Sequence, residues 1–155
     1  MNFDLAFVKL LGHEGGYVDD PRDPGGETKF GISKRSYPGE DIQALTLARA
    51  KALYLRDYWG PAGCDAVPDG AKFDLFDTAV NSGVRRAIKL VQQAVREVPD
   101  GVLGARTLQA LQSMPAARFV ARFNGARLAF MCSLPAWRDF SKGWALRIAG
   151  NLLEA

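Results

Sequence analysis

Residues 11–32, LGHEGGYVDDPRDPGGETKFGI, gather glycine, proline and acidic side chains between two more regular segments. Apolar residues at helical spacing in 3–11 precede this stretch, which predicts a helix ending at His13-Glu14. Gly15 or Gly16 would supply the positive φ that terminates helices. Turn-forming residues dominate 17–38, and only 28–32 alternate like a strand. The stretch therefore predicts a loop with at most a short β-hairpin.

Glu14 is the first candidate for chemistry in this stretch. A carboxyl group at the C-terminal end of a helix lies near the negative end of the helix dipole, and neighbouring Leu10 and Leu11 would desolvate it. Both effects raise the pKa, as a general acid at neutral pH requires. The adjoining glycines and Tyr17 would give a sugar close backbone approach and an aromatic face. The alternative is an exposed glutamate that merely ends a helix.

Asp23 and Thr28 form the second candidate group. Inverting glycosidases place a second carboxylate roughly 6.5–9.5 Å from the acid, which leaves room for a water molecule. A hairpin folding back from Asp23 could meet that distance, and the Thr28 hydroxyl could orient the water. Asp19 and Asp20 are weaker candidates for the same role, and all three fit ordinary turn positions. Thr28 also fits an ordinary strand position.

Composition narrows the class of protein. The chain has 155 residues and is 48% hydrophobic, which suits one compact domain. One histidine and the distant Cys64 and Cys132 argue against a metal site, and we expect no cofactor. No export signal or spanning segment is evident, so we expect no stable membrane insertion and predict two buried thiols in preference to a disulfide.

Charge is unevenly distributed. Residues 1–84 hold 9 basic and 13 acidic side chains, whereas residues 85–155 hold 11 and 4. A basic rear half could attract bacterial cell wall, membrane surface or another polyanion. No groove-reading motif accompanies it, so we expect no nucleic-acid partner. We interpret the basic residues of the last two helices as solvated surface: Arg118, Arg122, Arg127, Arg138, Lys142 and Arg147.

Helical spacing recurs through the rest of the chain, so we predict a mainly α fold with a small β-hairpin lobe. The predicted helices cover 46–59, with Thr46 as its cap and Leu47 packed inward, 68–83, 85–95, a short segment from about 104, 115–134 and 137–153. Asp77 falls on the apolar stripe of the second of these, where a structural hydrogen-bond acceptor is favoured over a catalyst. Asn81 follows one turn later and could either bind an acetamido group or cap the helix end.

Several motifs together resemble the glycoside hydrolase family 108 muramidases, many of which are endolysins of phages or prophages. They are His-Glu-Gly-Gly-Tyr at 13–17, Asp-Pro-Gly-Gly at 23–26 with Thr28 and Phe-Gly-Ile at 30–32, Tyr58-Trp59, and Phe-Asp-Thr-Ala-Val-Asn-Ser-Gly at 76–83. From about Arg85, Asp-Gly-Val-Leu-Gly at 100–104 and later Gly143-Trp144 resemble the peptidoglycan-binding module that usually follows.

The resemblance implies a lysozyme-like fold and cleavage of the β-1,4 bond between N-acetylmuramic acid and N-acetylglucosamine. It assigns the catalytic acid to Glu14. It also implies a catalytic segment over 1–84 and a peptidoglycan-binding-like segment over 85–155, packed together as one domain. We add Tyr17, Tyr58, Asp77 and Asn81 as candidate substrate-binding residues.

The expected partner is bacterial peptidoglycan, and we expect a monomer. Without an export signal, the protein would be made in the bacterial cytoplasm and reach the periplasm after a separate protein permeabilises the membrane. Three alternatives stay open: a lytic transglycosylase, which needs no second carboxylate; a non-catalytic wall-binding or secretion-assisting protein; and a polyanion binder.

Overall fold

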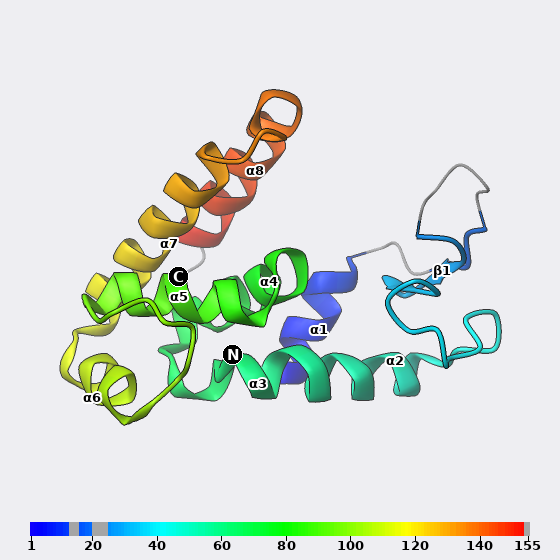
Figure 1. Cartoon of the computed structure of the whole chain (residues 1–155), viewed down its shortest axis with the longest axis horizontal. Helices are drawn as coiled ribbons and strands as arrows, with labels where there is room; N and C mark the ends of the chain where they lie inside the picture. Colours follow the sequence, from blue (N-terminus) through cyan, green and yellow to red (C-terminus); the bar gives the residue numbers. More distant parts are fainter. Residues whose placement is uncertain (13–15, 20–24, 154–155) are drawn as a thin grey trace. The chain divides into compact units, whose positions relative to one another are not determined.

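The computed structural model describes residues 1–12, 16–19 and 25–153, and it is mainly helical with one small antiparallel hairpin (Figure 1). This confirms the predicted fold class. Two compact units divide the chain, Phe3–Asp57 and Met1–Asn2 with Tyr58–Ala155. The predicted segment boundary at residue 84 lies inside the larger unit, where the helices on either side of it pack together.

The smaller unit begins with α1 (Phe3–Leu11). Ala6 and Phe7 are buried, and the Phe7 ring lies 5.5 Å from that of Tyr54. The helix ends earlier than predicted because Gly12 takes the left-handed conformation, with φ at +58°. An early glycine can adopt this φ without a Cβ clash, so the terminating residue is Gly12 instead of Gly15 or Gly16.

The predicted hairpin is present as β1 (Thr28–Lys29) and β2 (Ile32–Ser33), with Thr28 opposite Ser33. Phe30 and Gly31, the two turn residues, have φ values of +52° and +75°. Positive φ at both positions makes a type I′ turn, whose twist matches that of the strands. The Tyr54 hydroxyl donates to the Phe30 carbonyl at 3.2 Å. This bond fixes the turn against the following helix.

A helix with an irregular middle follows the hairpin. In α2 (Leu47–Tyr54), the Thr46 side chain accepts from the Arg49 amide at 3.1 Å, as the predicted cap should. A π-helical turn, η1 (Leu55–Trp59), and the short α3 (Gly60–Ala62) continue it. A π turn adds a residue to the repeat and rotates the side chains that follow. Trp59, the last residue of this turn, is buried. Leu47, the first residue of α2, was predicted to pack inward, but it is half-exposed.

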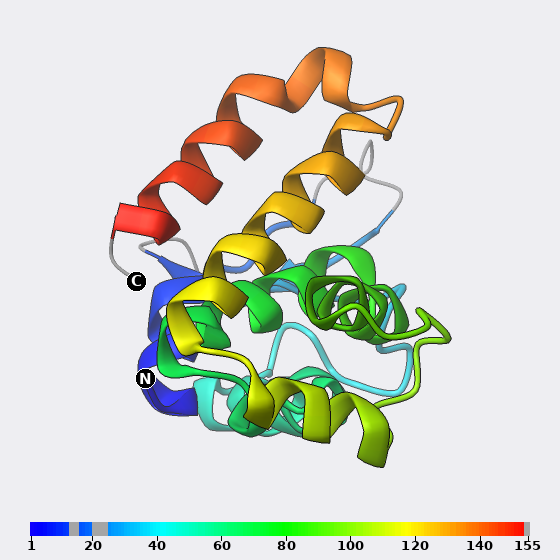
Figure 2. The same ribbon diagram turned by 90° about the vertical axis from the view of Figure 1, so that its left-hand side faces the viewer.

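The larger unit is built around α4 (Asp69–Ser82), which follows the 3₁₀ turn η2 (Cys64–Ala66). Buried residues lie on nearly all sides of α4, so it is the central helix of this unit. It packs on α5 (Val84–Val95) and α7 (Ala116–Cys132). In the sequence, α6 (Ala105–Ser113) lies between α5 and α7, and α8 (Trp137–Leu153) follows α7. Figure 2 shows α7 and α8 side by side as an antiparallel pair.

Aromatic side chains fill much of the core of the larger unit. The rings of Trp59 and Phe76 meet edge to face at 5.5 Å, and those of Phe119 and Phe123 lie 5.8 Å apart. All four side chains are buried. Each contributes about 1.5–3 kcal/mol through removal of apolar surface from water. Phe76 lies in the predicted helix 68–83, and Phe119 and Phe123 lie in the predicted helix 115–134, so both helices contribute to this core.

The Asp-Gly-Val-Leu-Gly motif is a structural turn. Buried Gln92 donates through Nε2 to Asp100 Oδ1 at 2.7 Å and to the Val102 carbonyl at 3.0 Å. Its Oε1 accepts from the Gly101 amide at 2.8 Å. The glutamine side chain thus satisfies the Gly101 amide, and it adds a second donor to the Val102 carbonyl, which also accepts from the Gly104 amide at 2.9 Å. These bonds give the motif a structural role in holding the turn.

Cys64 and Cys132 are both free thiols. Cys64 is buried, and burial raises its pKa to about 12. Cys132 is exposed at the end of α7, which corrects the prediction that both would be buried. No helix in the described part of the chain is long and apolar enough to cross a bilayer.

Candidate active site

The predicted site residues are distributed over both units. Tyr17 and Thr28 belong to the smaller unit, and Tyr58, Asp77 and Asn81 to the larger. The predicted acid Glu14 and the predicted base Asp23 lie outside the described residues.

Tyr17 and Thr28 are brought close together by main-chain pairing. Val18 and Thr28 exchange two backbone hydrogen bonds of 2.8 Å, so Tyr17 adjoins the start of the hairpin. The Tyr17 ring is partly exposed, and its hydroxyl donates to Glu27 Oε1 at 3.1 Å. Partial desolvation and then this bond raise the pKa of Tyr17. The phenol is therefore neutral near pH 7, and its ring is partly exposed beside the start of the hairpin.

The Thr28 hydroxyl also has a local partner. Its Oγ1 donates to the Gly26 carbonyl at 3.3 Å. Because the hydroxyl proton is used in this way, its lone pairs remain for accepting a hydrogen bond from water. The geometry suits both the strand position and the predicted water-orienting role.

Asn81 lies in the last turn of α4 and is exposed. Its Nδ2 donates to the Asp77 carbonyl at 2.8 Å and to Asp77 Oδ1 at 2.9 Å. Both partners are acceptors, so the amide nitrogen must face them and its oxygen is left to accept. Asn81 can thus receive an N–H group, such as that of an acetamido substituent.

Asp77 is almost fully buried and belongs to an ionic cluster. Arg127, also buried, donates through Nη2 to Asp77 Oδ2 and through Nη1 to Asp74 Oδ1 at 3.3 Å. Half-exposed Arg147 donates to Asp77 Oδ1 at 3.2 Å. Asp77 therefore has the structural-acceptor role that its place on an apolar stripe favoured. The interpretation of Arg127 as solvated surface was wrong, since its guanidinium neutralises two core carboxylates.

Asp74 is the second core carboxylate, and it was missed by the sequence analysis. Asn124 donates to Asp74 Oδ2 at 2.7 Å, and Asn151 donates to Asp74 Oδ1. Burial raises the pKa of Asp74, and the bond from Asn124 and the charge of Arg127 partly offset this rise. The available signal was spacing: Asp74 and Asp77, like Asn124 and Arg127, lie one turn apart within apolar surroundings.

Tyr58, the remaining candidate, is half-buried in the π-helical turn η1. Aromatic side chains with one exposed edge are suited to stacking on sugar rings. Among the described residues, no three acidic, histidine or cysteine side chains gather as a metal site would require.

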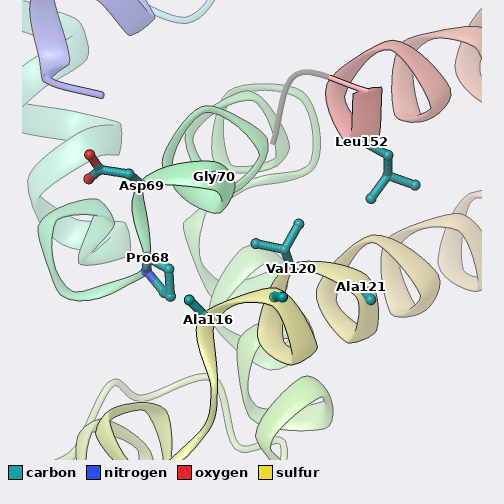
Figure 3. Close-up of a pocket in the computed structure, with 8 residues that line it drawn as sticks. Pro68, Asp69, Gly70, Ala116, Val120, Ala121 and Leu152 are labelled. Atoms are coloured by element: carbon teal, nitrogen blue, oxygen red, sulfur yellow. The ribbon is translucent and has the colours of Figure 1, made fainter.

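An apolar pocket of about 470 Å³ opens elsewhere in the larger unit. It lies between the starts of α4 and α7 and the end of α8 (Figure 3). Its lining residues are Pro68, Asp69, Gly70, Ala116, Ala117, Val120, Ala121 and Leu152. Asn81 lies near the opposite end of α4, about 18 Å along the helix axis. The pocket is therefore separate from the Asn81 cluster.

Comparisons with known proteins place the chain in one family. Residues 7–83 match the family described as glycosyl hydrolase 108, a span that runs from α1 to the glycine ending α4. The solved structure titled "Structure of Brucella abortus SagA" shares 36% sequence identity with this chain and superposes on it with a TM-score of 0.84. The match covers 98% of this chain and 92% of the SagA chain. No curated protein sequence matches the chain significantly. The chain belongs to the glycosyl hydrolase 108 family.

Proposed function

We propose that the protein is an N-acetylmuramidase that hydrolyses the β-1,4 bond between N-acetylmuramic acid and N-acetylglucosamine in peptidoglycan. The observation that carries the proposal is the extent of the family match. Residues 7–83 include both the Glu-Gly-Gly-Tyr motif with Glu14 and the helical motif that ends in Asn81. A glycoside hydrolase requires an acid of this kind together with groups that hold the sugar.

Glu14 acts as the general acid and gives its proton to the glycosidic oxygen as the bond to C1 breaks. Asp23 acts as the general base, taking a proton from a water molecule whose oxygen attacks C1. Thr28 orients that water through the hydroxyl lone pairs that its bond to Gly26 leaves available. The two carboxyl groups exchange protonation states in one turnover, and the product has inverted configuration.

Substrate binding uses aromatic and amide groups. Tyr17 and Tyr58 offer ring faces to the sugars, supported by the partial exposure of both side chains. Asn81 accepts a hydrogen bond from the acetamido N–H through Oδ1. Asp77 is a positioning residue in this scheme, because its oxygens fix the orientation of the Asn81 amide.

The test is product analysis of purified peptidoglycan after digestion and borohydride reduction. A muramidase yields fragments ending in reduced N-acetylmuramic acid. Ends in reduced N-acetylglucosamine would refute the bond assignment, and 1,6-anhydro ends would identify a lytic transglycosylase. Wall binding without any new ends would identify a non-catalytic wall-binding protein. NMR of the first-formed anomer checks inversion.

We further propose that the protein serves as a phage or prophage endolysin and acts as a monomer in the periplasm. Residues 85–155 would contribute wall binding, which their positive charge balance supports. Cytoplasmic expression should then leave cells intact until a membrane-permeabilising protein is co-expressed. Lysis without that second protein would contradict the proposed route.

A further inference from the structure

Asn81 of α4 and Arg147 of α8 share one acceptor atom. Asp77 Oδ1 accepts from Asn81 Nδ2 at 2.9 Å and from Arg147 Nη1 at 3.2 Å. Because both nitrogens bond the same oxygen, the amide and the guanidinium are held side by side at the C-terminal turn of α4. Both helices belong to the larger unit.

The two arginines on Asp77 differ in exposure. Arg127 is fully buried and spans both core carboxylates, whereas 48% of the Arg147 side chain is exposed. A guanidinium has five N–H donors. Among the residues that the structure describes, Asp77 is the one hydrogen-bond partner of the Arg147 side chain. Arg147 therefore keeps most of its donors available at the surface, beside an amide whose oxygen can accept.

This pairing suits two neighbouring substituents of one sugar. In N-acetylmuramic acid, C2 carries the acetamido group and the adjacent C3 carries the lactyl ether, which ends in a carboxylate or, with a stem peptide, an amide carbonyl. The acetamido N–H needs an acceptor, and the lactyl oxygens need donors. An amide oxygen next to an arginine provides both, and arginine matches the planar fork of a carboxylate.

We propose that Arg147 binds the 3-lactyl group of N-acetylmuramic acid while Asn81 binds its acetamido group. This inference rests on the proposed function and adds a determinant of selectivity for peptidoglycan over chitin, whose sugars lack the lactyl group. It also gives the C-terminal helix α8 a direct part in sugar recognition. Asp77 then orients both ligand-binding side chains, since its Oδ1 accepts from each of them.

The test compares two peptide-free glycans of equal length, one of alternating N-acetylglucosamine and N-acetylmuramic acid and one of chitin. Dissociation constants are measured by calorimetry in the Glu14→Gln background, alone and combined with Arg147→Gln or Arg138→Gln. Glutamine at 147 retains a donor for Asp77, and Arg138 is an exposed arginine of the same helix. Circular dichroism melting checks that each variant folds.

Arg147→Gln should weaken binding of the muramic-acid glycan roughly 10- to 100-fold, the effect of losing one charge-assisted hydrogen bond, and leave chitin binding within about threefold. Arg138→Gln should change neither. Equal losses for both glycans, or no loss for either, would overturn the inference. Absence of turnover by the otherwise wild-type chain, with the selective loss retained, would refute the hydrolase and leave the lactyl-binding role standing.

Discussion

Replacement of Arg127 by methionine tests whether the ionic cluster holds the larger unit together. The Arg127 side chain is 0% exposed, and it is paired with Asp74 and Asp77, which are 2% and 3% exposed. Methionine resembles the aliphatic stem of arginine but lacks the guanidinium, so it leaves two buried carboxylates without this counter-ion. Removal of one partner from a buried ion pair costs about 3–5 kcal/mol. For a chain of this size, we expect the melting temperature to fall by roughly 6–20 °C.

The assay is urea denaturation followed by circular dichroism at pH 7, with Arg138→Met as the exposed control, expected within about 0.5 kcal/mol of wild type. The stability that Arg127→Met removes should be smaller near pH 4. Burial already raises the pKa of Asp74, and a carboxyl group with a raised folded-state pKa stabilises the fold below its unfolded pKa and loses that contribution as pH rises. An Arg127→Met variant within about 1 kcal/mol of wild type at pH 7 would refute the reasoning.

Three further changes test other parts of the fold. Gly31→Ala should lower the free energy of unfolding by about 1–3 kcal/mol in urea titrations, because φ is +75° and the new Cβ would lie 2.4 Å from the Tyr54 hydroxyl; an unchanged midpoint would contradict the turn assignment. At pH 8, a thiol reagent should label one cysteine of the native protein, Cys132, and reach buried Cys64 only in denaturant; two native labels would contradict this. Gln92→Leu should lower the free energy of unfolding by about 1–3 kcal/mol, because the Gly101 amide loses its acceptor; a change under 0.5 kcal/mol in the same titration would show that water replaces the side chain.

The sequence was sufficient for the elements whose signals are local. Thr46 capped its helix as predicted, and residues 28–33 formed the expected hairpin, in which Gly31 readily takes the positive φ that a type I′ turn requires. The end of α1 was predicted too late, since several glycines could terminate it and the first, Gly12, does so. The family resemblance was confirmed from motifs that lie within residues 7–83.

Side-chain pairs between residues far apart in the chain could not be predicted from the sequence. Arg127 looked like other basic residues of its helix, and only its partners on α4 show why it is buried. The same applies to Arg147, whose 70-residue separation from Asp77 gives no local signal. Asn81 was recognised as a polar helix-end residue, but the orientation of its amide depends on which acceptors surround it. Glu14 and Asp23 stay predictions from motif and spacing.

The most direct test of the central claim is the rate at which purified peptidoglycan releases reducing ends with wild type and with Glu14→Gln. A general acid contributes about 10²–10⁴-fold to the rate, so we expect a loss of that size, with an unchanged melting temperature and retained wall binding. A Glu14→Gln variant that folds normally and keeps wild-type activity would contradict the assignment of Glu14 as the catalytic acid.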